Sequence, residues 1–322
     1  MADVVALGEA MLRLTAADGE RLRGADHLSV HVAGAECNVA VAVARLGVSA
    51  AWISALPEST VGHRVADEVR AAGVDLGAVT WVRGSRLGIF FADGGIPPRP
   101  TSVLYDRGGS AFAAQDSFDS SVLAGARCAV LSGITPALGA GPMAAARQFV
   151  ADAATAGARL CLDVNYRAQL WSPDVARDAL APFLAAASVV VCAQRDALSV
   201  FGLEGDPATV VAELRARWAP QADTVIVTAG EDGAIGLDAS GETLHQPARP
   251  TRVVDRFGAG DAFMAGLLWG SLRGGDLSDS LRCAVTLAAL KCTVRGDHSM
   301  TTAGELTTAL AARNGGQEAI VR

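Results

Sequence analysis

A carboxylate follows a glycine-rich turn in the stretch 253–266. A short apolar run ends at Asp255, the turn Gly258-Ala259-Gly260 comes next, and Asp261 stands where a helical pattern begins. Glycines let the backbone approach a ligand closely, and the free N–H groups at the positive end of a helix suit a phosphate. Asp261 would repel a resting phosphate, so it is better suited to take a proton from an attacking hydroxyl. The stretch therefore indicates phosphoryl transfer to an alcohol.

The same stretch has a simpler interpretation, in which a turn joins a strand to a helix and Asp261 only caps that helix. A carboxylate at a helix start accepts backbone N–H groups without any chemistry. A Gly-x-Gly pattern alone does not separate the two interpretations. The rest of the chain has to decide between them.

The composition is typical of a globular enzyme. The 322 residues leave room for a large core, and this length suggests roughly two domains or one large domain with a small appendage. The chain is 51% hydrophobic with 35 glycines, which argues against a disordered chain. Lys and Arg number 27 against 34 acids, giving a net charge of −7 without a basic tract. This balance argues against nucleic acid or an anionic membrane as the main partner.

The cysteines and the N-terminal residues predict a cytoplasmic protein. The six cysteines are scattered and form no Cys-x-x-Cys pair, which argues against zinc or thioredoxin-like chemistry. Residues 1–9 show no basic and apolar leader pattern. No apolar run reaches the roughly 18 residues that a membrane span needs. We therefore expect a reduced, cytoplasmic chain that does not contact a membrane.

Short apolar runs alternate with helical patterns, which predicts βαβ units and a mainly parallel sheet covered on both faces. The predicted strands are Val4–Leu7, Ala51–Ser54, Cys128–Leu131, Leu160–Val164, Val189–Cys192, Val225–Thr228 and Ile235–Leu237, with a further one ending at Asp255. The predicted helices cover residues 37–46, 60–72, 141–157, 174–186, 207–218, 261–272, 278–293 and 302–313.

Two segments interrupt this alternation. Residues 10–33 and 82–112 mix β-branched and aromatic residues with charges, glycines and prolines, which predicts a small separate sheet. The chain is thus divided into a core of residues 1–9, 34–81 and 113–322 and a discontinuous β lid of residues 10–33 and 82–112. A lid keeps water away from phosphoryl transfer. Its open edges and exposed apolar face predict a homodimer formed through the lid.

Polar residues and glycines follow the predicted strands at the place where doubly wound sheets bind ligands, outside the carboxyl ends of the strands. A set of Arg, Asn, Thr, Gly and Asp suits a site for a phosphate and a sugar. These residues are Asn165 to Arg167, Thr228 to Gly233, Gly258 to Asp261 and, between the first strand and the first long helix, Gly34 to Asn38.

Two of these motifs resemble signatures of the ribokinase-like (PfkB) carbohydrate kinases. The stretch Asp255 to Asp261 resembles the family pattern Asp-Thr-x-Gly-Ala-Gly-Asp, with Arg256 in place of Thr. Gly34-Ala35-Glu36-Cys37-Asn38-Val39-Ala40, followed by Ala44-Arg45-Leu46-Gly47, resembles the N-terminal sugar-binding signature, with Ala33 in place of a common Gly. The resemblance runs from about residue 4 to 313. It implies a three-layer α/β/α fold, with a mainly parallel sheet and a small β-sheet lid, that binds ATP and Mg²⁺.

Within this family, four stretches resemble the 2-keto-3-deoxygluconate kinases: Gly88 to Phe91, Leu104 to Ala111, Leu162 to Arg167 with Leu170-Trp171, and Ala289 to Thr293 leading to Gly296-Asp297. The implied reaction transfers the γ-phosphoryl group of Mg·ATP to the terminal hydroxyl of this sugar acid. A kinase for fructose, ribose or a nucleoside is the nearest alternative, and a catalytically silent sugar or nucleotide sensor is an alternative of another class. A dinucleotide-dependent oxidoreductase is disfavoured, because no Gly-x-Gly-x-x-Gly follows the first strand.

The resemblance implies a role for each matching residue. Asp261 is the implied catalytic base, and Gly258, Ala259 and Gly260 form the implied anion hole. The implied sugar-acid contacts are Gly34, Asn38, Phe90, Tyr105, Arg107, Arg167 and Asp297. The implied nucleotide contacts are Asn165, Arg167, Thr228, Gly230, Gly233, Gly258 and Gly260. An arginine fork is the natural partner of the substrate carboxylate, so Arg107 or Arg167 fills that role and leaves the other to bridge toward phosphate.

The metal region departs from the family pattern. Ala193-Gln194-Arg195-Asp196 stand where many members place Asn-x-x-Glu, so Asp196 is the implied ligand of Mg²⁺, acting through water. Asp255 is interpreted as a structural residue that orients the turn, with a monovalent cation beside it as the alternative. Lys291 is interpreted as a surface residue. Arg256 either helps to hold ATP or is a solvated turn residue.

Overall fold

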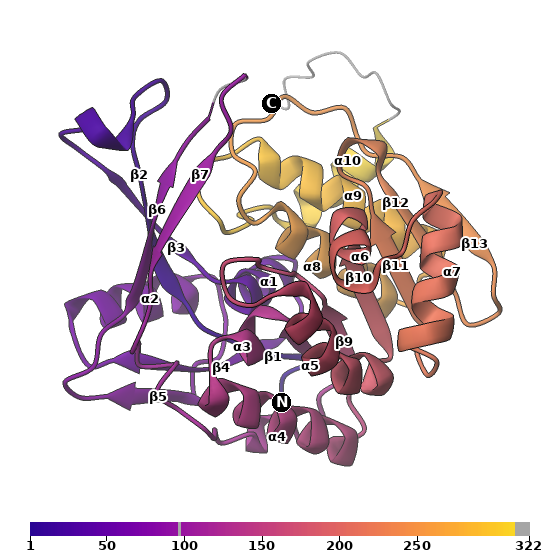
Figure 1. The fold of residues 1–322 in the computed structure, drawn as a ribbon, viewed down its shortest axis with the longest axis horizontal. Helices are drawn as coiled ribbons and strands as arrows, with labels where there is room; N and C mark the ends of the chain where they lie inside the picture. The colour runs from indigo at the N-terminus through magenta and orange to yellow at the C-terminus, as the bar shows by residue number, and fades with distance from the viewer. Residues whose placement is uncertain (96–97, 313–322) are drawn as a thin grey trace.

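The computed structural model describes residues 1–95 and 98–312. Its large sheet has the strand order β13-β12-β11-β10-β9-β8-β1-β4-β5 (Figure 1). The strands are β1 (Val4–Leu7), β4 (Ala50–Pro57), β5 (Val79–Val82), β8 (Cys128–Ser132), β9 (Arg159–Asp163), β10 (Val189–Ala193), β11 (Thr224–Thr228), β12 (Ala234–Leu237) and β13 (Thr243–Gln246). The pairs from β5 to β11 are parallel, whereas β12 and β13 are antiparallel. The carboxyl ends of β1 and β8–β11 therefore lie along one edge.

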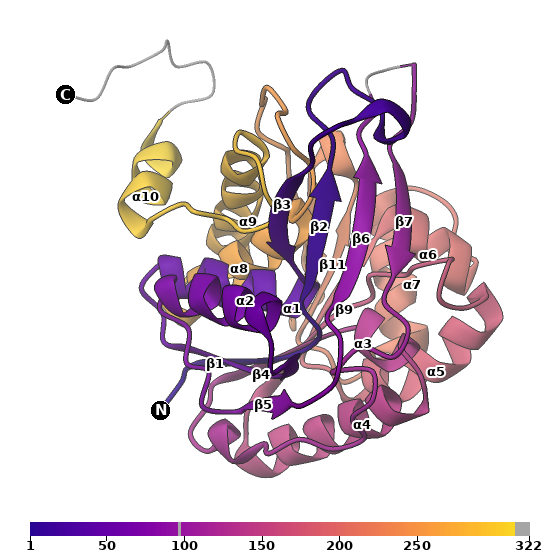
Figure 2. The same ribbon diagram turned by 90° about the vertical axis from the view of Figure 1, so that its left-hand side faces the viewer.

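Helices cover both faces of this sheet, and each face has its own apolar core. One core gathers residues of α1, α2, α8, α9 and α10, and the other gathers residues of α4, α5, α6 and α7 (Figures 1 and 2). The helices are α1 (Ala35–Arg45), α2 (Thr60–Ala71), α3 (Ile134–Ala137), α4 (Ala140–Ala156), α5 (Pro173–Ala186), α6 (Gln194–Phe201), α7 (Pro207–Trp218), α8 (Ala259–Leu272), α9 (Leu277–Cys292) and α10 (Ala303–Ala311). Short 3₁₀ turns are η1 (Leu22–Gly24), η2 (Ser121–Leu123) and η3 (Gly230–Asp232).

Local sequence sets many of the helix ends. The side chain of Asp206 accepts the amides of Ala208 and Thr209, and Pro207 occupies the first turn, where its missing N–H is harmless. Thr302 and Glu305 form a reciprocal capping box at the start of α10. Such caps satisfy backbone donors that a helix start otherwise leaves unpaired. They explain why the starts of these helices are readable from the sequence.

The small sheet has the order β3-β2-β6-β7, with β2 (Met11–Thr15), β3 (Ser29–Ala33), β6 (Gly88–Asp93) and β7 (Ser102–Asp106). Strands β2 and β6 pair in parallel, and β3 and β7 add antiparallel edges. One face packs Met11, Ala33, Phe90 and Ala92 against Tyr105 and against Phe257 of the glycine-rich turn. Figure 2 shows the four strands standing side by side above the large sheet. The small sheet therefore touches the segment that carries Asp261.

The expected α/β architecture, with a large mostly parallel sheet and a small separate one, is confirmed. The strand predicted to end at Asp255 is wrong, because residues 247–257 carry no strand and Val253 and Val254 are 43% and 45% exposed. The edge strands β5 and β13 and the helix α6 were not predicted, and Val82 ends β5 rather than opening the lid. The division into core and lid segments stays a prediction. Within the described residues, none of the helices has the length and apolar character to cross a membrane.

Candidate active site

Asp261 lies at the N-terminal end of α8, beside the first helix of the chain. Its carboxylate accepts a hydrogen bond from Asn38 of α1, with 2.6 Å between Nδ2 and Oδ2. It is the third residue of the helix, Gly258 is the N-cap, and no side chain caps this end. The interpretation of Asp261 as a helix cap is therefore wrong. Burial raises the pKa of Asp261 to about 6, against the opposing effects of the Asn38 hydrogen bond and the charge of Arg167.

The backbone amides beside Asp261 form a donor cluster at the positive end of α8. Within the described residues, the amides of Gly258, Gly260 and Asp261 have no hydrogen-bond partner, whereas the amide of Ala259 donates to the carbonyl of Arg256 at 3.2 Å. Gly258 has φ +79°, and a Cβ there would lie 1.9 Å from the carbonyl oxygen of Asp297. A Cβ on Gly260 would meet no atom within 4 Å, so this residue faces open space. An anion fits where these free amides converge.

A buried arginine of the small sheet holds the turn before the helix. Arg13 of β2 is 2% exposed and pairs with Asp255 through Nη1 and Nη2 at 3.2 and 2.5 Å. Its Nε lies 3.0 Å from Oδ2 of Asp297, and its guanidinium stacks 4.4 Å above the ring of Phe257. Sequence reasoning missed Arg13. Its only signal was a charge inside an apolar lid strand, with no hint of the distant partners.

Asp255 and Asp297, the two acids that pair with Arg13, have pKa values that are shifted in opposite directions. Burial alone would raise the pKa of Asp255, but the hydrogen bond and charge of Arg13 outweigh it and hold this pKa below the ordinary value. The Asp255 carboxylate also accepts the amides of Phe257 at 3.0 Å and Gly296 at 3.1 Å, which fits its predicted role in orienting the turn. Burial raises the pKa of Asp297 to about 7, with Arg13 opposing the shift and Asp255 adding to it.

Arg107, one of two arginines expected to read a substrate carboxylate, already has an acidic partner. Its Nε and Nη2 donate to the buried carboxylate of Glu9, with Nε at 3.0 Å, and the hydroxyl of Ser110 donates to the same carboxylate. Glu9 was not predicted as a site residue. The charge of Arg107 is therefore balanced within the protein, and its guanidinium lies 5.6 Å from the ring centre of Tyr105. Tyr105 in turn packs on Phe90, with 5.4 Å between ring centres.

Arg167 differs from Arg107 because its guanidinium has no partner among the residues that the structure describes. In the described part of the chain it has neither a hydrogen bond nor an ion pair, and its Nε is shielded from solvent. Burial raises the pKa values of Asp163, Asp196 and Asp261, and the positive charge of Arg167 opposes each of these shifts, so Arg167 lies within electrostatic reach of all three acids. An arginine with three acids around it and no direct partner is available for an anionic ligand.

Three acids act on one another near the carboxyl ends of the strands: Asp163 at the end of β9, Asp196 in the first turn of α6 and Asp261 in the first turn of α8. Burial, and then the charges of Asp261 and Asp196, raise the pKa of Asp163 to about 8. Asp196 is buried, accepts the amide of Tyr166 at 3.2 Å and has its pKa raised by burial. Asn165 donates to Asp163 at 3.3 Å and holds a left-handed φ of 40°, a strained conformation that often marks functional positions.

The acids can accommodate Mg²⁺ only with help from other ligands. Across residues 1–95 and 98–312, no three or more His, Cys, Asp or Glu side chains are arranged to hold a metal ion. Mg²⁺ usually keeps several waters and takes one or two carboxylates together with substrate phosphates. Burial is the main cause of the raised pKa of Asp163, and the repulsion from Asp261 and Asp196 that adds to it would be relieved by such a cation. Asp163 and Asp196 therefore fit a metal held largely by water and nucleotide.

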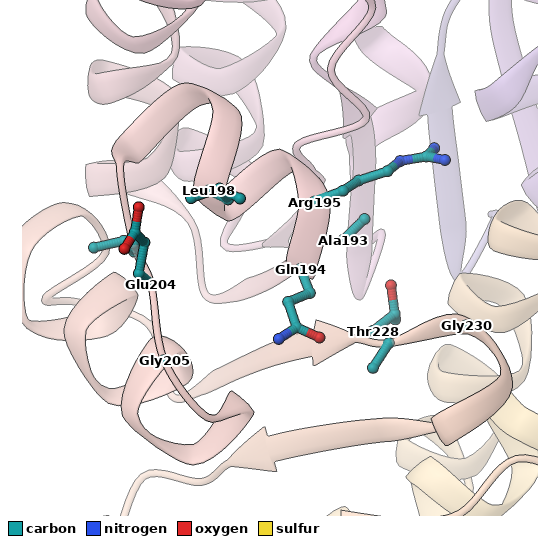
Figure 3. Close-up of a pocket in the computed structure, with 10 residues that line it drawn as sticks. Ala193, Gln194, Arg195, Leu198, Glu204, Gly205, Thr228 and Gly230 are labelled. Carbon is teal, nitrogen blue, oxygen red and sulfur yellow. The ribbon is translucent and has the colours of Figure 1, made fainter.

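A cavity of about 680 Å³ opens beside α6 and the end of β11. Figure 3 shows Gln194 reaching toward the end of β11, where Thr228 lies, while Arg195 extends away. Of the expected nucleotide contacts, Thr228 and Gly230 line this cavity. Gly233 does not: its carbonyl accepts the amide of Ala229 at 2.8 Å, and a Cβ there would lie 2.1 Å from a backbone oxygen.

Three further residues are placed as follows. Gly34 is the N-cap of α1 with φ +153°, and a Cβ there would lie 2.3 Å from the carbonyl oxygen of Glu9. Arg256 is exposed and pairs with the exposed Glu231 at 3.0 Å, which fits the solvated-turn alternative. The interpretation of Lys291 as a surface residue is wrong, because its side chain is fully buried and its Nζ donates to backbone carbonyls.

Comparisons with known proteins identify the family of this chain. The model of the pfkB family carbohydrate kinases matches residues 1–303. A 2-dehydro-3-deoxygalactonokinase of Haloferax volcanii is 40% identical over 311 residues, covering 96% of each chain. A 5-dehydro-2-deoxygluconokinase of Shouchella clausii is 28% identical and covers 89% of each chain. The crystal structure of a 2-dehydro-3-deoxygluconokinase from Thermotoga maritima superimposes with a TM-score of 0.90 at 30% identity, covering 96% of this chain and 98% of the other. The chain therefore belongs to the pfkB family and is an ATP-dependent carbohydrate kinase.

Proposed function

We propose that this kinase phosphorylates the terminal hydroxyl of a 2-keto-3-deoxy sugar acid, 2-keto-3-deoxygluconate or its galacto epimer. The observation that carries this assignment is Arg167, whose guanidinium has no partner among the described residues and whose charge acts on Asp261, the proposed base. A neutral sugar would leave that partly buried charge uncompensated, whereas a carboxylate forms a charge-assisted pair with it. The names of the Haloferax volcanii and Thermotoga maritima relatives support the same class of substrate.

The residues of the site divide the work of the reaction. Asp261 accepts the proton of the attacking hydroxyl, and Asn38 orients that carboxylate through its 2.6 Å hydrogen bond. The free amides of Gly258, Gly260 and Asp261 stabilise charge that develops on the transferred phosphoryl group. Phe90 and Tyr105 of the lid cover the sugar and exclude water. Arg107, neutralised by Glu9, donates to sugar hydroxyls rather than reading the carboxylate.

The nucleotide occupies the cavity lined by Thr228 and Gly230, so that its phosphates lead toward the N-terminus of α8. Bound Mg²⁺ supplies charge neutralisation for the phosphates. Asp163 and Asp196 would hold it, Asp196 through water, and Asn165 keeps the Asp163 carboxylate in place.

A substrate panel tests the assignment. We expect ADP release with 2-keto-3-deoxygluconate and 2-keto-3-deoxygalactonate at far higher kcat/KM than with 5-keto-2-deoxygluconate, fructose, ribose or adenosine. A neutral sugar that matches the keto-deoxy acids would contradict the role of the carboxylate. Nucleotide binding without turnover of any acceptor would instead indicate a sensor.

Paired arginine variants test which guanidinium reads the acid. We expect Arg167→Met to raise KM for the sugar acid by about 100-fold, because a charge-assisted bidentate pair contributes about 1.5–3 kcal/mol. KM for ATP should change much less. Arg107→Met should weaken all acceptors to a similar degree, and the exposed Arg256→Met is the matched control. Equal losses for acid and ATP in Arg167→Met would remove this arginine from carboxylate recognition.

We also propose that the outer face of the lid pairs two copies of the chain. Val30, Leu14, Phe91 and Leu104 stand directly opposite one another across the four strands, and Leu104 is 66% exposed. Leu14, Val30 and Phe91 are half-buried, and an apolar row on a sheet face that is only partly covered favours association. Leu104→Asp should convert a dimer to a monomer in light scattering, whereas Val175→Asp, at an exposed apolar residue of α5, should not. A wild-type monomer at working concentration would contradict the proposal.

A further inference from the structure

A fully buried ammonium group lies under the glycine-rich turn. Lys291, in the last turn of α9, has 0% exposure, and its Nζ donates to the carbonyl oxygens of Asp255 at 3.2 Å and Val294 at 3.4 Å. Removing an ammonium group from water is costly unless other groups replace its hydration. Two backbone carbonyls do so here, and no side-chain acceptor is bonded to Nζ among the described residues.

The two segments around this ammonium are the ones that shape the anion site. The amides of Val254 and Asp255 donate to the carbonyl of Cys292 at 2.8 and 3.2 Å, and the amide of Gly296 donates to the Asp255 carboxylate. Lys291 closes the same loop by joining the carbonyls of Asp255 and Val294. A few residues further on, Gly258 packs its backbone against the carbonyl of Asp297. The position of the free amides therefore depends on what holds the Asp255 and Val294 carbonyls together.

Backbone carbonyls directed at one positive charge are the ligands that replace the hydration shell of a monovalent metal cation. The monovalent cation left open beside Asp255 does not fit here, because the Lys291 ammonium already takes these oxygens and Arg13 takes the Asp255 carboxylate. Burial lowers the pKa of Lys291, while the charges of Asp255 and Asp297 oppose that shift and favour the ammonium form.

We propose that the Lys291 ammonium is a built-in substitute for a monovalent cation beneath the anion-hole turn, so that this kinase works without K⁺ or NH₄⁺. Lys291 is then a positioning residue: it touches neither substrate nor nucleotide and acts by holding the carbonyls of Asp255 and Val294 together. This role of Lys291 does not depend on which sugar acid is phosphorylated, and unfolding midpoints test it without any measurement of activity.

The wild-type enzyme provides the first test. Initial rates at saturating Mg·ATP and acceptor are compared in KCl, NH₄Cl, NaCl and choline chloride at equal ionic strength. We expect rates within about twofold of one another, the range left for residual salt effects. Activation by K⁺ or NH₄⁺ of about fivefold or more over choline at the same ionic strength would overturn the proposal, because screening alone treats these salts alike.

Lys291→Met provides the second test, with Arg282→Met as a matched control on an exposed residue of the same helix. In choline chloride we expect Lys291→Met to lose about 10- to 100-fold in kcat, since two buried carbonyls lose their donor and the turn loosens. K⁺ or NH₄⁺ should restore about tenfold of this loss and raise the unfolding midpoint of the variant by about 2 °C relative to choline, by binding to its folded state. Arg282→Met should respond to neither salt.

Full activity of Lys291→Met in choline would overturn the proposal. So would a loss that K⁺ and NH₄⁺ restore neither in rate nor in unfolding midpoint, because the lysine would then act by packing alone. If Lys291→Met does not fold, Lys291→Gln, whose neutral amide group lacks the charge, takes its place under the same criteria. The wild-type salt comparison decides independently of either variant.

Discussion

Removing the donor of the Asn38–Asp261 hydrogen bond should shift the pH dependence of the reaction. Burial places the pKa of Asp261 at about 6, and the bond from Asn38 lowers it from a still higher value. A hydrogen bond to a charged group contributes about 1.5–3 kcal/mol, and one pKa unit corresponds to about 1.4 kcal/mol. In Asn38→Ala we therefore expect the pKa of Asp261 to rise by about 1.5 units, which is within this range.

The direction of the change in activity follows from the role of Asp261 as a base, because a base works only when it is deprotonated. With the pKa shifted from about 6 to about 7.5, the deprotonated fraction at pH 6 falls about 15-fold, whereas at pH 8.5 it changes by only about 1.1-fold. The loss in kcat/KM should therefore be large in acid and nearly absent in mild base. Asn38→Ser can keep a donor near the carboxylate, so its kcat/KM at pH 6 should lie between those of the wild type and Asn38→Ala.

The assay is kcat/KM from pH 5 to 9 with coupled detection of ADP, using a coupling system shown to be in excess at each pH. The acid limb of the wild-type profile should lie near pH 6, where burial places the pKa of Asp261. A loss in Asn38→Ala that is equal at every pH would refute the reasoning and would assign Asn38 to sugar binding, the role first expected for it. An acid limb that does not move would do the same.

Four further predictions concern the turn and its supports. Asp261→Asn should keep the fold and ATP binding in calorimetry but lose about 10²–10⁴-fold in turnover, whereas retained turnover would remove Asp261 from the role of base. Gly258→Ala should fold poorly because its Cβ would lie 1.9 Å from a carbonyl oxygen, whereas Gly260→Ala, with open space around its Cβ, should keep its unfolding midpoint and lose activity. Arg13→Met should destabilise the protein by about 3–5 kcal/mol in urea unfolding, because it leaves the buried Asp297 and the half-buried Asp255 without their cation. The folded-state pKa of Asp297, about 7, lies above its ordinary value, so the folded protein keeps a proton that the unfolded chain releases. The free energy of unfolding should therefore fall as pH rises toward 7. Asp297→Asn should flatten this fall when unfolding is compared at about pH 5 and about pH 7.

Much of the main fold could be predicted from the sequence because its elements carry local signals. The helix 207–218 was predicted with its observed bounds, since the Asp206 cap and Pro207 mark its start in the sequence. The strand Val4–Leu7 is a short apolar run buried on both faces, and its bounds were also predicted. The run ending at Asp255 looked the same and is not a strand, because Val253 and Val254 face solvent and the segment is bonded to the end of α9 instead. Short apolar runs do not reveal which of these two outcomes applies.

The site could be predicted only where local motifs mark it. Asp261 and its glycines form a contiguous motif, and their position at the start of α8 follows from that motif. Arg13 and Asp255 are 242 residues apart in sequence, and Arg107 and Glu9 are 98 apart, so no local pattern connects either pair. These pairings depend on how the small sheet lies over the turn. Tertiary packing alone decides them.

The ion pairs that Arg13 of β2 forms with Asp255 and Asp297 limit how the enzyme can be re-engineered. A designer who replaces the small sheet by that of another sugar kinase, to change the preferred sugar, also removes the cation that Asp255 and Asp297 share. Such a chimera would place a new binding surface over a turn that has lost its counter-charge. Retaining Arg13 while exchanging its neighbours on β6 and β7 separates acceptor choice from the integrity of the turn.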